Sequence, residues 1–303
     1  MSSRTIPVDL FNPGQVFACL GLVELSQLLI GDTCAAFDWS DPRQACFVIR
    51  CGGETDPVEA ALGFLARAEI HSVSPDAENL KTSKWKVDTA PLPDGAPFPI
   101  PAPRSPATLP ALLAEGTTRI ELHSWGDGKI PGTVWAQRDN VKFWAGSGGY
   151  PGAAILRDAL DLVRDEILGA IDAPFELSAP QSGSFRFDWR RDYIPIDVGF
   201  SLNAHPHMSP RGFPLVEILA LIGISYARPE RLTKLDYRYS VCSVGPAPLG
   251  PDAATLLPPS LLRAALGSRS LPFPTRSFRM RLDWPGQENQ ARCITSVYEE
   301  SHS

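Results

Sequence analysis

Proline places the strongest limits on how this chain folds. The 303 residues include 30 prolines, and seven of them lie between Ala90 and Pro106, in the stretch APLPDGAPFPIPAPRSP. Each proline fixes φ and removes a backbone N–H donor, which excludes such a stretch from helix interiors and central strands. We therefore expect residues 90–106 to form a polyproline-like linker or a surface loop between an N-terminal α/β part (1–89) and a C-terminal α+β part (107–303).

The charge balance is acidic, and the apolar content is that of a folded protein. Lys and Arg number 28 against 34 Asp and Glu, which gives a net charge of −6, and apolar residues make up 44% of the chain. The apolar content excludes a disordered chain. The negative charge argues against a free-standing nucleic-acid-binding protein, which is usually basic, although it is compatible with local basic strips.

The sequence predicts neither membrane insertion nor export. The longest apolar runs, Val16–Val23 and Ile218–Ile224, are much shorter than the ~20 residues that span a bilayer, and a glutamate flanks each of them. The N-terminal residues lack the apolar region of a signal peptide. The six cysteines form no C-x-x-C pair and are typical of small buried side chains in a reducing compartment. We therefore expect a soluble cytoplasmic protein that does not contact a membrane.

Capping residues and apolar periodicity predict both helices and strands. Asn12 and Pro13 indicate the start of a helix over 14–30 that Gly31 ends, and Asp56-Pro57 starts another. Further helices are predicted over 106–115, 153–171 and 214–224. Strands are predicted over 45–51, 119–124, 133–137, 141–145, 184–189, 196–202, 234–242, 277–284 and 291–298. Because helices and strands do not alternate regularly, we predict an α+β fold of mixed antiparallel sheets with packed helices.

A glycine-rich stretch, GSGGYPG (146–152), lies between a predicted strand and a predicted helix. Gly146, Gly148 and Gly149 would let the backbone approach a phosphate closely, beside the positive end of the helix dipole. The stretch is not a Walker A motif, and Pro151 occupies the third glycine position of the dinucleotide-binding motif. The alternative is a flexible turn without a ligand.

Two similar segments, SFRFDWRRDY (184–193) and SFRMRLDW (277–284), alternate polar with apolar residues. In a strand, alternation places Phe185, Phe187 and Trp189 opposite Arg186, Asp188 and Arg190, and likewise Phe278, Met280, Leu282 and Trp284 opposite Arg279, Arg281 and Asp283. One interpretation is a half-buried antiparallel sheet with salt bridges on its outer face. The other is an arginine-rich face for a phosphate backbone, with aromatic side chains available for stacking.

A third basic group follows the predicted helix over 214–224. It comprises Arg228, Arg231, Lys234 and Arg238, and Lys81, Lys84 and Lys86 form a separate patch. Such groups are usually solvated surface, but they can also contact nucleic acid.

The sequence offers little for catalysis. His205 and His207 form the only close histidine pair, and no carboxylate or cysteine stands at the offset that a metal site needs. Ser147 is not a nucleophile of the G-x-S-x-G type, because Ala145 replaces the first glycine. We therefore predict a protein that is not an enzyme and has no cofactor. A nucleotide-binding enzyme that uses the glycine-rich stretch is the weaker alternative.

Three segments together resemble a known family: IPVDLFNPGQVFACLGLVEL (6–25), SGSFRFDWRRDYIPIDVGFSLN (182–203) and FPLVEILALIGISYARP (213–229), with support from FWAGSGG (143–149). The family is a small subunit of type I-U (also named I-G) CRISPR interference systems. It has been grouped both with the large, Cas-eight-like subunits and with the repeat-associated RNA-binding (RAMP) proteins. The second grouping implies a ferredoxin-like βαββαβ core.

The resemblance implies a non-catalytic subunit of a Cascade-type surveillance complex. Its partners would be other effector subunits, guide RNA and target DNA, and it would help to recognise the PAM or the opened duplex, while base pairing reads the target sequence. The candidate nucleic-acid contacts come from the residues alone: Arg186, Arg190, Arg191, Arg279, Arg281, Arg228, Arg231, Lys234, Gly146, Gly148 and Gly149. The alternative is a purely structural subunit that docks its partners through the helices over 14–30 and 214–224 and the proline-rich segment.

Overall fold

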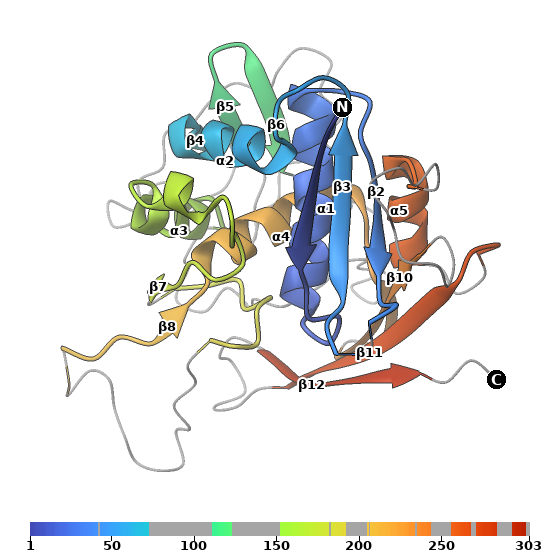
Figure 1. The fold of residues 1–303 in the computed structure, drawn as a ribbon. Helices are drawn as coiled ribbons and strands as arrows, with labels where there is room; N and C mark the ends of the chain where they lie inside the picture. The colour runs from blue at the N-terminus through green and yellow to red at the C-terminus, as the bar shows by residue number, and fades with distance from the viewer. Residues whose placement is uncertain are drawn as a thin grey trace, which may run out of the picture.

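The structure is a computed structural model, and it describes residues 1–41, 43–72, 111–122, 152–181, 183–191, 205, 207–233, 235–243, 256–267, 271–283 and 293–300. The helices are α1 (Pro13–Leu29), α2 (Pro57–Arg67), α3 (Gly152–Val163), the short 3-10 helix η5 (Ile167–Ala170), α4 (Pro214–Tyr226) and α5 (Pro259–Leu266). The strands are β1 (Ser2–Pro7), β2 (Cys34–Asp38), β3 (Cys46–Cys51), β4 (Glu69–Ser72), β5 (Ala111–Glu115), β6 (Thr118–Leu122), β7 (Ala179–Pro180), β8 (Arg211–Gly212), β9 (Glu230–Thr233), β10 (Asp236–Cys242), β11 (Thr275–Asp283) and β12 (Cys293–Glu300). The α+β class is confirmed (Figure 1).

Two apolar helices, α1 and α4, form the centre of the molecule. The Asn12 side chain accepts a hydrogen bond from the Gly14 amide at 3.1 Å, so the predicted cap of α1 is confirmed. The helices cross so closely that a Cβ atom on Gly21 would lie 2.0 Å from the Leu219 carbonyl oxygen, and one on Gly223 would lie 2.1 Å from that of Phe17. The two longest apolar runs of the sequence are therefore core helices, and glycine permits their contact.

The first sheet has the strand order β1-β3-β2, and both pairings are antiparallel. β1 and β2 are consequently parallel to each other on either side of β3, and α1 connects them as in a split β-α-β unit. The chain order β1-α1-β2-β3-α2-β4 is that of a ferredoxin-like core. The correspondence stops at β4, which pairs with β5 in another sheet (β4-β5-β6) and not with β1.

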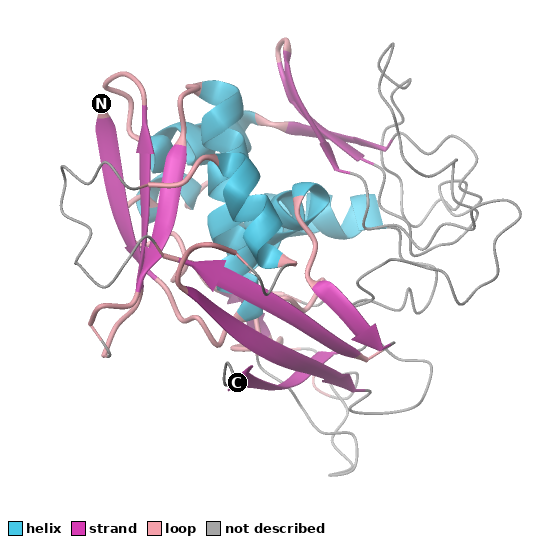
Figure 2. Cartoon of the chain, turned by 90° about the vertical axis from the view of Figure 1, so that its right-hand side faces the viewer, coloured by secondary structure: helices cyan, strands magenta, loops and turns pink. Residues whose placement is uncertain are grey.

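The second large sheet, β12-β11-β10-β9, is antiparallel and packs its apolar face on the central helices. Tyr239 and Phe278 are paired across β10 and β11 and stack at 5.3 Å between ring centroids, and the Tyr239 hydroxyl donates to the Leu10 carbonyl at 2.7 Å. Figure 2 shows the helices between this sheet and the β1-β3-β2 sheet. One hydrophobic core includes side chains from both sheets and from α1 and α4.

Most of the predicted elements that fall within the described residues are confirmed. They are the helices α1, α2 and α4 and the strands β3, β6, β10, β11 and β12. The proline-rich segment 90–106 and the strands predicted over 133–137, 141–145 and 196–202 lie outside the described residues. Helix α5 and strands β1, β2, β4, β7, β8 and β9 were not predicted.

Two helix predictions are wrong in part. The helix predicted over 106–115 is contradicted at Ala111–Glu115, which forms strand β5 and turns at Gly116 (φ 56°) into β6, because pairing with β4 and β6 outweighs the helix propensity of its Ala and Leu residues. The helix predicted over 153–171 ends at Val163. The next residue, Arg164, donates through Nη1 to the carbonyls of Ala66 and Ala68 at 2.8 and 3.1 Å, and η5 follows as a separate turn.

Candidate nucleic-acid interface

The segment 183–191, which carries three of the candidate arginines, is a loop. The strand predicted over 184–189 is therefore wrong, although Phe185 and Phe187 are both buried as alternation predicts. Arg186 between them adopts φ 62°, and its amide donates to the Ser184 hydroxyl at 2.9 Å, which turns the chain out of the extended conformation. Trp189 leaves the face predicted for it and is 47% exposed.

Asp188 points inward and joins this loop to the start of α1. Its carboxylate is buried and accepts a hydrogen bond from Asn12 Nδ2 at 2.9 Å. The backbones meet at the same place, because a Cβ atom on Gly14 would lie 2.7 Å from the Asp188 amide nitrogen. The Asp188 amide in turn donates to Glu217 Oε1 at 3.1 Å, in the first turn of α4.

Arg190 is held by carboxylates of its own chain. Its guanidinium group contacts Asp188 at 2.7 Å and Glu176 at 3.0 Å, donates to the Phe175 carbonyl at 2.6 Å, and lies 3.6 Å from the centre of the Phe213 ring. Burial alone would lower the pKa of Arg190, but the hydrogen bonds and charges of Asp188 and Glu176 outweigh it and raise that pKa. This side chain is therefore positioned mainly by internal contacts.

Buried polar atoms gather around the inner side of the loop. Glu217 and Gln181 are each 1% exposed. Within the described residues, Glu217 Oε2 and both side-chain amide atoms of Gln181 have no hydrogen-bond partner. Burial raises the pKa of Glu217 to about 7, with a further contribution from the charge of Asp188. Arg191 donates through Nη2 to the Gln181 carbonyl at 2.7 Å.

The loop adjoins the large sheet at the first residue of β12. Burial raises the pKa of the Cys293 thiol, and the neighbouring positive charges of Arg186 and Arg191 oppose that rise. Arg186 and Arg191 therefore lie beside the end of the sheet that carries Arg279 and Arg281, and the structure brings these two groups of candidate residues together.

The sheet itself confirms the alternation predicted for β11. Phe278, Met280 and Leu282 are buried, whereas Arg281 and Asp283 are exposed on the opposite face. Trp284 lies outside the described residues.

Carboxylates neutralise part of the arginine-bearing face of the sheet. Arg279 donates through Nε to Asp236 at 2.8 Å, and this hydrogen bond lowers the pKa of Asp236 and raises that of Arg279. Arg238, opposite Arg279 in the register, contacts Glu230 at 2.6 Å and Glu300 at 2.5 Å. No ion pair engages Arg281 within the described residues, which leaves its charge available to a ligand.

The remaining candidates are scattered or lie outside the described residues. Arg228 is half-buried after α4, and Arg231 on β9 donates through Nε to the Thr233 carbonyl at 3.3 Å. His205 and His207 are exposed, and the described part of the chain holds no cluster of three possible metal ligands. Lys81, Lys84, Lys86, Gly146, Gly148, Gly149 and Lys234 lie outside the described residues.

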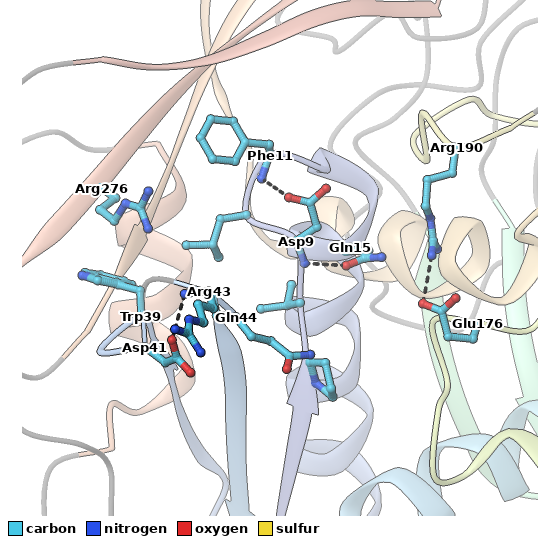
Figure 3. Close-up of a pocket in the computed structure, with 14 residues that line it drawn as sticks. Asp9, Phe11, Gln15, Trp39, Asp41, Arg43, Gln44, Glu176, Arg190 and Arg276 are labelled. Atoms are coloured by element: carbon cyan, nitrogen blue, oxygen red, sulfur yellow. Dashed lines mark hydrogen bonds and ion pairs between the residues drawn. The ribbon is translucent and has the colours of Figure 1, made fainter.

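Sequence reasoning missed a cleft of about 490 Å³ beyond the C-terminal ends of β1 and β2 (Figure 3). Five separate parts of the chain line it: residues 7–11 with Gln15, the β2–β3 turn, Glu176, Arg190, and Arg276 at the start of β11. Arg276 forms a two-pronged pair with Glu299, with both distances 2.7 Å, and its guanidinium group lies 5.8 Å from the centre of the Trp39 ring. The one sequence signal was a tryptophan followed by the polar turn Ser40-Asp41-Pro42-Arg43.

The cleft combines aromatic, basic and acidic side chains. Phe11 is 37% exposed, and its ring is fixed edge-on against Phe278 at 5.1 Å between centroids. Arg43 is exposed, and among the described residues no ion pair engages it. A second cavity, of about 480 Å³, lies on the β4-β5-β6 sheet and includes Arg119.

Comparisons with known proteins add no relative: no protein-family model, curated protein or solved structure matches the chain. Within the described residues, every helix is too short or too polar to cross a membrane.

Proposed function

We propose that this chain is a non-catalytic subunit of a CRISPR surveillance complex, working in the cytoplasm with other effector subunits and contacting guide RNA or target DNA. The segments that resemble the family support it, because they converge in space: Asn12, Asp188 and Glu217 come one from each segment and form a continuous hydrogen-bonded junction. The partial ferredoxin-like order of the N-terminal elements agrees with the RAMP grouping.

The cleft beyond the C-terminal ends of β1 and β2 is the observation that supports nucleic-acid contact. Arg190, within one of those segments, lines one side of the cleft, and Trp39 and Phe11 offer ring surfaces. Arg43 offers a guanidinium group that no ion pair engages within the described residues. Arginine next to accessible aromatic rings is the combination that binds single-stranded nucleic acid. Arg43 and Arg281 are the best phosphate contacts, since carboxylates already engage Arg190 and Arg279.

A purely structural subunit is the second candidate. The internal ion pairs of Arg190, Arg238 and Arg279 favour it, as does the net charge of −6. In that case partner subunits would supply the whole positive channel, and this chain would only hold them together.

The reconstituted complex distinguishes the two candidates. We would compare the wild type with the Arg43→Ala/Arg281→Ala variant, measuring bound nucleic acid from the 260/280 absorbance ratio and affinity as a function of salt. The plot of log K against log[salt] has a negative slope, and each lost phosphate contact makes that slope shallower by about 0.7–0.9. Arg119→Ala is the control, because Arg119 does not line the cleft and is exposed on β6, a strand that lies at the opposite end of the molecule from the C-terminal ends of β1 and β2 (Figure 1). An intact complex with unchanged affinity and slope would favour the structural subunit.

A further inference from the structure

We infer that the cleft holds one unpaired nucleotide whose base carries an exocyclic amino group, as cytosine does. The inference rests on the proposed function for the source of that nucleotide, a single-stranded end or an extruded base. A cleft of about 490 Å³ lies in the range of small-molecule sites, ~300–1,000 Å³, and is suited to a nucleotide and not to a duplex.

Two aromatic side chains define where the base lies. Trp39 is half-buried at the end of β2, and Phe11 is held by Phe278. Figure 3 shows Trp39 and Phe11 on the same part of the cleft, beside Arg276. Since Glu299 already engages Arg276, the guanidinium group of Arg276 serves to orient the indole. The indole then offers its ring to a base by stacking, which every base accepts.

The carboxylates of the cleft select the edge of the base. Asp41 Oδ1 accepts from the Arg43 amide at 2.8 Å, and Asp9 Oδ1 accepts from the Phe11 amide at 2.9 Å. Within the described residues the second oxygen of each carboxylate accepts no hydrogen bond, and it is free to accept one from an amino group. Carboxylates pair with the N4 amino group of cytosine, whereas the O4 atom of uracil is an acceptor and would be repelled.

The charge of the cleft limits the ligand to one phosphate. Asp9, Asp41 and Glu176 would repel a polyphosphate, while Arg43 can bind a single phosphate group. Arg43 follows Asp41 by two residues, so a base whose amino group contacts Asp41 places its phosphate within reach of Arg43.

Binding of short single-stranded oligocytidine and oligouridine probes to the purified full chain, followed by fluorescence anisotropy, tests the inference. The wild type should prefer oligocytidine by about 5-fold or more. Trp39→Ala should weaken oligocytidine binding by about 5-fold or more, and Trp39→Phe should restore most of it. Asp41→Asn, which keeps the acceptor for the Arg43 amide, should abolish the preference. Trp189→Ala removes an exposed tryptophan that does not line the cleft and should leave binding unchanged.

Three results would overturn the inference: no binding of either probe, equal affinity for the two, or a folded Trp39→Ala chain that binds as the wild type does. The proposed function would fail separately, if the reconstituted wild-type complex contacted nucleic acid only through its other subunits. If the complex with the Trp39→Ala variant kept its RNA and the salt dependence of its binding, the nucleotide-binding role of the cleft would be refuted, but the proposed function would not.

Discussion

Replacing Gly21 by alanine should destabilise the protein by forcing the two central helices apart. The added Cβ atom would lie 2.0 Å from the Leu219 carbonyl oxygen, whereas an ordinary C···O contact is about 3.3–3.6 Å, so α4 would have to retreat by more than ~1 Å. Overpacking costs about 1–3 kcal/mol, and a clash with backbone atoms, which cannot move aside as a side chain can, belongs at the upper end of that range, while alanine regains up to ~1 kcal/mol of helix propensity. We therefore expect a net loss of about 2 kcal/mol, which lowers Tm by about 4 °C.

Urea unfolding and thermal unfolding, both followed by circular dichroism, measure this loss. Gly63→Ala is the matched control, because Gly63 is also buried in a helix, α2, but an added Cβ atom would meet only the flexible Arg67 side chain at 3.5 Å. This substitution should stabilise the protein by up to ~1 kcal/mol. If Gly21→Ala were as stable as Gly63→Ala, the close crossing of α1 and α4 would be wrong.

Two further predictions concern the buried junction. The pKa of Glu217 is about 7 in the folded state against an ordinary 4.5, so the unfolded chain releases its proton first and stability falls as pH rises from 4.5 to 7, by about 3 kcal/mol in total. Glu217→Gln should remove this fall. The free energy of unfolding, measured by urea titration at several pH values, would refute the burial of the carboxyl group if it changed with pH equally in both proteins. Asn12→Ala should destabilise the protein by about 2–4 kcal/mol, because it loses both the α1 cap and the donor to buried Asp188. Asp56→Ala, which removes the α2 cap and a partly exposed ion pair with Arg4, should cost only about 1–2 kcal/mol, and equal losses for the two variants would contradict the role of the Asn12–Asp188 bond.

Local signals predicted the elements that depend on local chemistry. The Asn12-Pro13 and Asp56-Pro57 pairs start α1 and α2 as expected, because a capping side chain and a proline in the first turn act within a few residues. The alternation of β11 was also predictive, since one face of that strand packs on the core and the other is outward.

Where the local sequence pattern predicted the wrong secondary structure, tertiary contacts determine the observed conformation. Residues 184–189 alternate as β11 does, but the φ of 62° at Arg186 and the bond from Asn12 to Asp188 make a loop of them. Ala111–Glu115 has good helix formers and is nonetheless a strand, because its partners β4 and β6 lie beside it. The cleft could not be predicted, since its lining comes from segments as distant as Phe11 and Arg276 and no local pattern joins them.

Ultraviolet cross-linking of the reconstituted complex, followed by mass spectrometry of this chain's peptides, tests direct nucleic-acid contact. The proposal predicts nucleotide adducts on peptides that contain Trp39 or Phe11, beside the exposed Arg43, and their loss in the Arg43→Ala/Arg281→Ala variant. Adducts confined to the partner subunits, with none on this chain, would contradict it and leave a protein that only holds its partners together.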